Sequence, residues 1–119
     1  MTQPENLGSI SPNRVPVAIR PNYMISYERG PVCIYVHADV FGWNKRVKAE
    51  FTRDIDILQA LLGEPVYVAG RGGGDLKLAK FLDLFGFLFC GSVISDETQK
   101  AVPIFCRPFP GKPILVFQH

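Results

Sequence analysis

The sequence predicts one α/β domain of the α+β kind, in which a central mixed sheet of about five to seven strands carries two main helices. Three observations lead to this class. The β-branched and aromatic run VCIYVHADV, residues 32–40, is typical of a central strand. The segments 45–62 and 75–85 repeat apolar residues at helical spacing. Strand-like runs fill the rest, in the order strand, strand, strand, helix, strand, helix, strand, strand.

The first third of the chain predicts a tail followed by three strands. Residues 1–16 hold three prolines and no apolar period, so we expect an extended tail there. The runs VAIR at 17–20 and YMISYE at 23–28 are strand-like. A turn at 29–31 leads into the run at 32–40, which we expect to be buried on both faces because it contains few polar residues.

The segment 45–62 predicts the longest helix. Its apolar residues form one stripe at spacings of three and four, made of Val47, Phe51, Ile55, Leu58 and Leu62. The polar residues expected largely off this stripe are Lys48, Arg53, Asp54 and Gln59. Gly63 and the following Glu64-Pro65 predict the end of the helix.

A strand and a second helix are predicted next. VYVAG at 66–70 is short and apolar, as expected of a buried strand. The helix is expected to begin at Asp75, a favourable N-cap, and to end at about Phe85, before Gly86. Its apolar residues again share one face, and they are Leu78, Phe81, Leu82 and Phe85.

The last part of the chain predicts an antiparallel hairpin and a tail. Strand-like runs at 87–95 and 100–108 flank the polar turn DETQ. Pro103 in the second run indicates an edge position or a bulge, because proline cannot donate to a ladder. We therefore expect one domain at 17–107, followed at 108–119 by a C-terminal tail or edge strand that includes the apolar run ILVF.

Composition excludes several classes of function. The formal net charge is +2 with scattered basic residues, so there is no specific nucleic-acid signal. No apolar run reaches the roughly 18 residues of a membrane span, and the N-terminus lacks a signal-peptide pattern. We expect a cytoplasmic protein rather than a secreted one. Three cysteines favour reduced, buried thiols, and two histidines predict no metal site.

A glycine-rich junction at 70–74 raises the possibility of a phosphate-binding loop. Glycines before a helix allow backbone amides to approach a phosphate. The stretch fits neither the P-loop pattern nor the dinucleotide pattern, since Asp75 follows the glycines. A flexible corner is therefore the favoured interpretation.

Two other places could carry chemistry. Lys45 and Arg46 lie at the start of the long helix, where cations oppose the helix dipole, so they either complement an anion or are solvated. His37 and Asp39 share one strand face. They are the catalytic candidates, with His37 as general base, although a hydrogen-bonded structural histidine is the favoured alternative.

Residues 32–107 resemble the GNAT superfamily of N-acetyltransferases, especially its short, divergent members in tailed bacteriophages. VCIYVHADVFGWNKRVKAEF is similar to the core strand, pyrophosphate loop and following helix of that superfamily. EPVYVAG is similar to the next strand, which splays from the first to admit coenzyme A. DLKLAKFLDLFGFLFCGSVI is similar to the later helix, with its terminal Gly-Phe, and the strand after it.

The resemblance implies an acyl-CoA N-acyltransferase-like fold with a site for acetyl-CoA. Backbone amides near Asn44, Lys45 and Arg46 would hold the diphosphate, by the physics of a helix N-terminus. The strands around Val36 and Val68 would accept the pantetheine arm.

The chain also departs from the pattern. Asp75, the remaining implied cofactor-binding residue, replaces an asparagine that is frequent at the start of the later helix. The pyrophosphate loop retains Arg46 and Ala49 but lacks the glycine between them. Leu82 stands where a general-acid tyrosine is frequent. Residues 1–31 show no pattern for the two helices that usually form the acceptor site.

These observations leave three functions open. The first is a GNAT-like phage protein that has lost catalysis and acts as a structural, virion-associated or binding protein. It would require no cofactor, and its partners would be other phage subunits or copies of itself. The second is an N-acetyltransferase that transfers acetyl from acetyl-CoA to an amine. The third is a small α/β inhibitor of a host factor.

Overall fold

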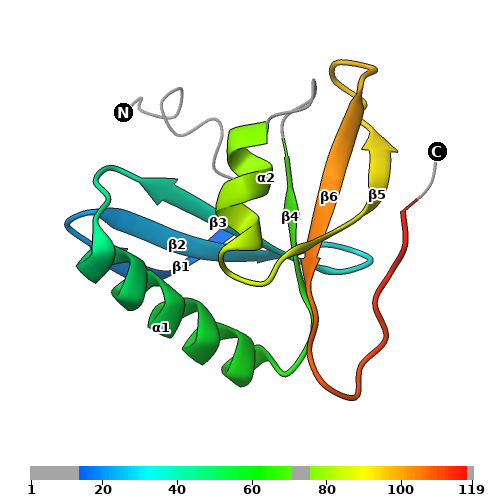
Figure 1. Cartoon of the computed structure of the whole chain (residues 1–119). Coiled ribbons are helices and arrows are strands. Elements are labelled where there is room, and N and C mark those ends of the chain that lie inside the picture. The colour runs from blue at the N-terminus through cyan, green and yellow to red at the C-terminus, as the bar shows by residue number, and fades with distance from the viewer. Residues whose placement is uncertain (1–13, 71–75, 118–119) are drawn as a thin grey trace, which may run out of the picture.

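Six strands form one mixed sheet in the order β1-β2-β3-β4-β6-β5 in the computed structural model, which describes residues 14–70 and 76–117 (Figure 1). Two helices are present in the same residues. The bounds are β1 (Arg14–Arg20), β2 (Tyr23–Arg29), β3 (Ile34–Val40), α1 (Lys45–Leu62), β4 (Val66–Ala69), α2 (Leu76–Asp83), β5 (Leu88–Ile94) and β6 (Ala101–Arg107). The element order and the α+β class predicted from the sequence are confirmed.

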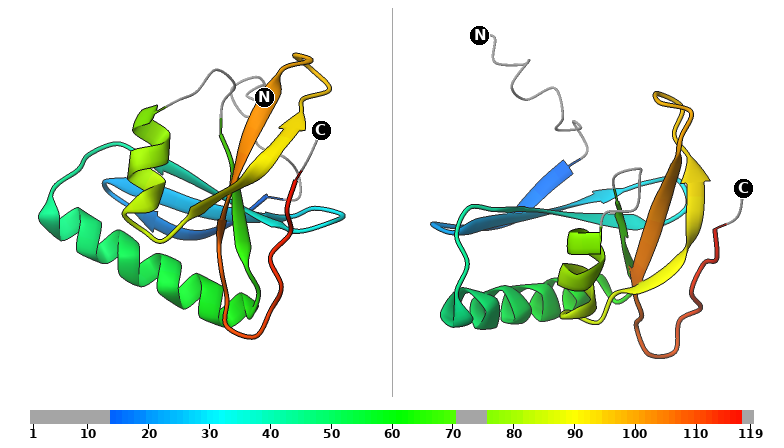
Figure 2. Two further views of the ribbon diagram at one scale, coloured as in Figure 1. Left: turned by 45° about the vertical axis from the view of Figure 1, so that its right-hand side comes forward. Right: turned by 45° about the horizontal axis from the view of Figure 1, so that its top comes forward.

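The helices cover the face of the sheet that carries the main core. α1 runs along the β1–β3 part of the sheet, and α2 stands beside β4 (Figures 1 and 2). Alternate residues of β2, such as Tyr23 and Ile25, are fully buried on this face. A second, smaller cluster contains Cys33, Tyr67 and Cys106. The sheet is therefore packed on both sides near β4 and β6.

The parallel strands β3 and β4 pair over only two positions. Ile34 is opposite Val66, and Tyr35 is opposite Tyr67. Beyond these pairs β3 continues to Val40, still paired with β2, while β4 continues alongside β6. The two strands separate as they leave this short ladder (Figure 1). We call this feature the β3–β4 divergence. It divides the sheet into a β1-β2-β3 half and a β4-β6-β5 half.

The boundaries of α1 follow from its capping residues. The Asn44 side chain accepts a hydrogen bond from the Val47 amide at 2.9 Å. Gly63 ends the helix in the left-handed conformation, with φ 67°, and its amide donates to the Gln59 carbonyl. The predicted stripe is buried at Val47, Phe51, Ile55 and Leu58. The prediction that Asp54 and Gln59 lie off the buried face is wrong, because partners on distant strands bind both of them.

The apolar face predicted for the second helix packs against the core. Leu82 and Phe85 are buried, and Leu78 and Phe81 pack against the same cluster. The regular helix ends at Asp83, and Gly86, with φ 83°, completes the turn that follows. The predicted N-cap Asp75 and the glycine corner at 72–74 lie outside the described residues.

Two predictions about strands need correction. β6 lies between β4 and β5, so Pro103 is not on an edge. The β5–β6 register does shift next to Pro103, but the extra residue lies in β5, between Phe89 and Ser92, and Ser92 pairs with Pro103. β3 is not buried on both faces, because its last three residues are exposed where β4 no longer accompanies it. β1 begins at Arg14, within the stretch expected to be a tail.

Residues 108–117, here called the terminal segment, return along β5. Phe117 forms an isolated parallel bridge with Gly91. Its amide donates to the Cys90 carbonyl at 2.9 Å, and its ring meets the Tyr67 ring edge-on at 5.8 Å. The Leu115 amide donates to the Tyr67 hydroxyl. A terminal edge segment was one of the two predicted alternatives for this part of the chain.

Gly91→Ala is expected to detach the terminal segment from β5. A Cβ at this position would lie 1.9 Å from the Phe117 carbonyl oxygen, and φ is 118°, so neither the space nor the backbone suits alanine. Faster hydrogen exchange at the Phe117 amide would report the detachment. Gly63→Ala is the matched control, since it also has positive φ but nothing lies within 4 Å. Unchanged exchange at Phe117 in Gly91→Ala would contradict the expectation.

Candidate functional site

The β3–β4 divergence is the candidate site, because the predicted cofactor residues of the two strands lie on its two sides. The pairing between β3 and β4 ends at Tyr35 and Tyr67. Val36 follows Tyr35 on β3, and Val68 follows Tyr67 on β4. Val36 is 3% exposed and belongs to the main core, against which Val68 also packs. Both side chains therefore contact the protein's own interior.

An aromatic cluster packs beside the divergence, where both helices meet the sheet. It consists of Trp43, Phe51, Phe81 and Phe85. The ring centroids of Phe51 and Phe85 are 4.8 Å apart, and those of Trp43 and Phe81 are 5.2 Å apart. Such tilted and edge-on contacts stabilise a core beyond the area that they bury. Trp43 was not predicted to belong to the core, although it stands just before a helix whose apolar stripe includes Phe51, and this pattern is a signal in the sequence.

Leu82 lies in the same core as this cluster. It is 5% exposed and shares its hydrophobic cluster with Val36 of β3 and Val66 of β4. This is the position at which the resemblance predicts a general acid. A buried leucine side chain has no proton to donate.

The first turn of α1 is basic. Lys45, Arg46 and Lys48 are all exposed, and the turn contains no acidic residue. Asn44 uses its side-chain oxygen to cap its own helix. The helix dipole and these cations together favour an anion at this end. The predicted diphosphate residues are thus brought together at one exposed end of α1.

His37 is held between two side chains on the opposite sheet face. Arg14 Nη2 donates to His37 Nδ1 at 3.0 Å, and His37 Nε2 donates to Glu28 at 3.2 Å. This pattern defines a neutral imidazole with both nitrogens engaged. Burial and then Arg14 lower the pKa of His37 below its ordinary value of 6.5. Asp39 is exposed on the same strand face. In this arrangement His37 has no free lone pair with which to act as a base.

Stability is expected to fall as the pH drops below about 6.5, because of His37. The unfolded chain binds the proton at this ordinary pKa, whereas the folded chain resists it, so the unfolded state takes up more protons in this range. Denaturant unfolding at pH 7.5 and 5.5 measures the difference. His37→Gln should show a smaller loss than the wild type, since its side chain does not titrate. Equal losses in both proteins would contradict the assignment.

A partly buried ion pair links α1 to the β1–β2 hairpin. Arg20 donates to both carboxylate oxygens of Asp54, at 2.8 and 2.9 Å, and the Tyr23 hydroxyl donates to Asp54 at 2.6 Å. These hydrogen bonds, first that from Arg20, lower the pKa of Asp54. Burial and the bond to Asp54 raise the pKa of Tyr23 to about 12. The group stabilises the fold and leaves Asp54 without a free proton-transfer role.

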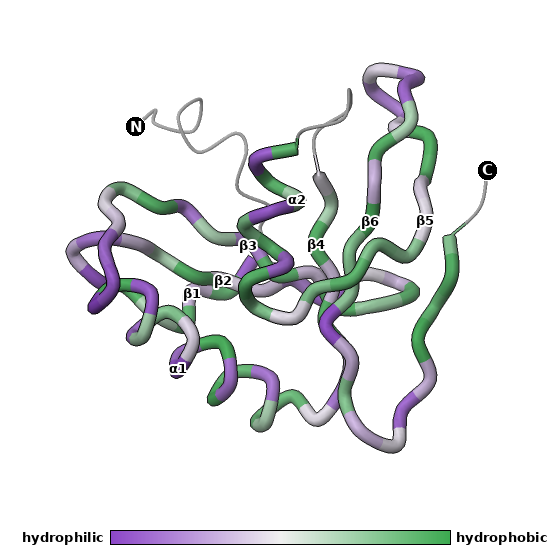
Figure 3. The backbone as a smooth tube through the Cα atoms, in the orientation of Figure 1, coloured by the Kyte–Doolittle hydropathy of each residue, from purple (hydrophilic) through white to green (hydrophobic). Residues whose placement is uncertain are grey.

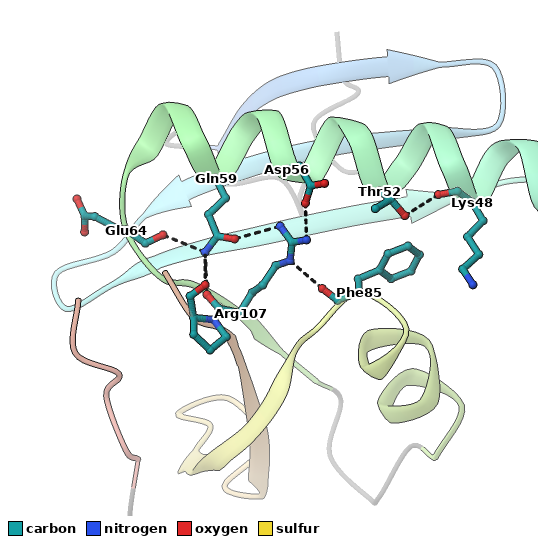
Figure 4. A network of polar contacts seen from close by, with 8 residues as sticks. Lys48, Thr52, Asp56, Gln59, Glu64, Phe85 and Arg107 are labelled. Carbon is teal, nitrogen blue, oxygen red and sulfur yellow. Dashed lines mark hydrogen bonds and ion pairs between the residues drawn. The ribbon is translucent and has the colours of Figure 1, made fainter. Parts of the chain in front are cut away.

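A second network joins α1 to the end of α2 and to β6 (Figure 4). Arg107 donates to the Phe85 carbonyl at 2.7 Å and to Gln59 at 3.0 Å, and it forms an ion pair with Asp56. Gln59 in turn donates to the Arg107 and Pro108 carbonyls. Each of the three guanidinium nitrogens of Arg107 donates to a protein acceptor, so this network is structural.

Two surface hollows are lined by other residues. One of about 410 Å³ lies between Asp56, Phe85, Arg107 and the terminal segment. The other, of about 360 Å³, lies between α2 and β5. Among the described residues, none of the predicted catalytic or cofactor residues lines either of them. Sequence reasoning did not find these hollows, because their walls come from segments far apart in the chain.

The cysteines are free thiols in the second core. Cys33 and Cys106 are buried, and Cys90 is partly buried. Burial raises the pKa of all three, that of Cys90 to about 11. They are protonated at neutral pH and are poor nucleophiles. Within residues 14–70 and 76–117, no cluster of three or more His, Cys, Asp or Glu residues is placed to hold a metal ion.

Comparison with protein families, with curated proteins and with solved structures finds no match to this chain. The class of protein is therefore defined by the fold alone, as an α+β domain with a six-stranded mixed sheet and two helices in the described residues. Neither of these helices combines the length and the apolar character needed to cross a bilayer.

Proposed function

We propose that this chain is a catalytically inactive protein of the acyl-CoA N-acyltransferase-like fold, which acts through contacts as a structural or virion-associated binding protein. The fold assignment is supported by the order of elements and by the β3–β4 divergence, which has the form expected from the resemblance to the GNAT superfamily. The bacteriophage setting rests on the resemblance to short members of that superfamily in tailed phages.

The burial of Leu82 in the core beside the divergence is the main support for a loss of catalysis. The resemblance implies a cleft for the pantetheine arm and, frequently, a proton donor for the departing thiolate. Here Val36 and Leu82 belong to one buried apolar cluster. Neither side chain can donate a proton, and neither is exposed to line a cleft. His37 also supports a loss of catalysis, because both of its ring nitrogens already form hydrogen bonds within the protein.

An acetyl-CoA-dependent N-acetyltransferase is the second candidate. It is favoured by the basic first turn of α1, where amides near Lys45 and Arg46 could hold a diphosphate. In this function Val36 and Val68 would flank the pantetheine arm after the core opened. Asp39, or His37 after release of Arg14, would accept the proton of the amine.

Calorimetric titration with acetyl-CoA and with CoA tests the proposal. The inactive protein is expected to give no binding heat at millimolar ligand. Micromolar binding that weakens at least about tenfold in Arg46→Ala would overturn it in favour of the enzyme. Arg53→Ala is the matched control, because Arg53 is an exposed cation of α1 beyond its first turn. An acetyl-transfer assay on small amines with the same samples should give no product.

A further inference from the structure

We propose that one end of the molecule binds the surface of an anionic lipid bilayer. This end, here called the basic tip, is the stretch 40–48, which contains the last residue of β3, the loop after it and the first turn of α1. The tip combines apolar side chains with cations. They are Val40, Phe41, Trp43, Lys45, Arg46 and Lys48. The inference deepens the proposed function and rests on it, because it names the surface that a protein acting through contacts would bind.

The apolar side chains of the basic tip are open to solvent. Phe41 is 70% exposed, and Trp43 and Val40 are 41% and 40% exposed. The Trp43 ring is nevertheless fixed against the core, because its centroid lies 5.2 Å from that of Phe81. An aromatic ring as exposed as that of Phe41 gains free energy when an apolar phase covers it.

The backbone holds the loop of the basic tip in place. The Phe41 and Gly42 amides both donate to the Asn22 carbonyl, at 2.7 and 3.2 Å, which fastens the loop to the turn between β1 and β2. Gly42 permits this close approach, because a Cβ there would lie 2.8 Å from the Asn22 side-chain oxygen. After the loop, Asn44 caps α1. A loop that is already ordered loses little conformational entropy on binding.

The basic tip is one continuous surface because its residues are neighbours in the chain. The end of β3, the turn between β1 and β2 and the start of α1 lie at the same end of the molecule (Figures 1 and 2). Hydrophobic residues at the end of β3 lead directly into the hydrophilic start of α1 (Figure 3). One partner can therefore meet the apolar side chains and the cations together.

The cations of the basic tip are available to an anionic partner. Lys45, Arg46 and Lys48 are exposed, and none of them takes part in an ion pair with another described residue. Asp39 is the one acidic residue between positions 38 and 48. Three cations against one carboxylate leave this end of the molecule positively charged.

An anionic bilayer is the partner that suits both features. Each lysine or arginine close to an anionic membrane strengthens binding by roughly fivefold. Stable attachment takes a second contribution, and side chains inserted at the interface supply it. In the basic tip, Phe41 provides the ring for insertion, and the first turn of α1 provides the cations for the lipid head groups.

Single-stranded nucleic acid is a weaker candidate for the partner. Proteins bind it in a positively charged groove, where successive bases stack on several aromatic side chains. Neither of the two surface hollows is lined by residues 40–48. Phe41 is the one ring of the basic tip that is mostly exposed. A bilayer surface requires no groove and only a shallow insertion.

Fluorescence titration of the full chain with lipid vesicles tests the inference. Trp43 is the only tryptophan of the chain and lies in the basic tip, so its emission reports contact with lipid directly. Vesicles of phosphatidylcholine with phosphatidylglycerol are expected to shift this emission to shorter wavelength. Pure phosphatidylcholine should bind at least about tenfold more weakly, because the cations then contribute nothing. High salt should also weaken binding to the anionic vesicles.

Two variants separate the contributions of the ring and of the cations. Phe41→Ala should weaken binding to the anionic vesicles at least about fivefold, because the inserted apolar area is lost. The double variant Lys45→Ala/Lys48→Ala should weaken it by roughly 25-fold, at about fivefold for each cation. Trp43 is kept in both variants, so the same signal measures them.

Matched controls remove the same kinds of side chain elsewhere. Leu61→Ala truncates an apolar residue that is 81% exposed at the C-terminal end of α1. Arg53→Ala/Lys100→Ala removes two exposed cations outside the basic tip. Both controls should bind the anionic vesicles within about twofold of the wild type. Circular dichroism checks that every variant is folded, and the double lysine variant keeps the test valid if Phe41→Ala unfolds.

Four outcomes would overturn the inference: no binding to anionic vesicles, equal binding to both kinds of vesicle, wild-type binding by either folded tip variant, or binding lost in a control. Binding of a single-stranded oligonucleotide in place of vesicles would assign the basic tip to nucleic acid instead. The vesicle titration uses no CoA. A chain that binds neither vesicles nor CoA would contradict this inference alone, whereas CoA binding would contradict the proposed function.

Discussion

Phe51→Ala is expected to lower the free energy of unfolding by about 3–5 kcal/mol, as truncation of a core phenylalanine does. Phe51 is 3% exposed, and its ring contacts Tyr23 and three members of the aromatic cluster. The substitution removes these contacts and leaves a cavity between α1, α2 and the sheet. Urea or guanidinium denaturation, followed by far-ultraviolet circular dichroism, measures the loss.

Ile57→Ala provides the comparison for Phe51→Ala on the same helix. Ile57 is 51% exposed, so its truncation should cost less than about 1 kcal/mol. If the two variants were equally stable, the aromatic cluster would not hold the helices to the sheet. Such a result would also contradict the interpretation of this space as core rather than a cofactor cleft.

Asp54→Ala is expected to cost about 2 kcal/mol, within the range for leaving a buried hydrogen-bonding group unsatisfied. The carboxylate is almost fully buried, and its removal leaves the buried Tyr23 hydroxyl without its acceptor. Arg20 is 41% exposed and can be rehydrated, which limits the loss. Chemical denaturation at neutral pH provides the measurement, and Tyr23→Phe completes a double-mutant cycle.

The pH dependence gives an independent check on Asp54. Its pKa is lower in the folded chain than in the unfolded chain, so the pair contributes its full stability above about pH 4. The contribution disappears as the pH falls through the folded pKa. Wild type and Asp54→Ala should therefore converge in stability in acid. Asp56→Ala is the control at neutral pH, because this 57% exposed carboxylate should contribute about 1 kcal/mol or less. A loss as large as that of Asp54→Ala would contradict the distinction.

Under the proposed function, β3 and β4 still separate from one another, but the space beside them is filled by core side chains. Apolar side chains of α1 and α2 pack with those of both strands beside it. The two halves of the sheet then give the chain two separate edges, β1 and β5. A protein that acts through contacts would use such an edge, and both edge strands carry exposed apolar side chains.

Much of the secondary structure could be predicted because its signals are local. The stripe from Val47 to Leu58, the cap at Asn44 and the stop at Gly63 all act within one or two turns of α1. The hairpin of β5 and β6 follows from two strand-like runs around a polar turn. The buried thiols Cys33 and Cys106 follow from their apolar neighbours in the chain.

The chain's local chemistry thus decided which segments are helices and strands, and which helix face is apolar. Only the folded chain decided that Asp54 is buried, because its partner Arg20 is 34 residues away. The same holds for Gln59 and Arg107, which lie 48 residues apart, and for the insertion of β6 between β4 and β5. Long-range pairing is chosen by the packing of all elements together. A polar residue on a helix therefore reveals its role only when the partner that neutralises it has been brought beside it.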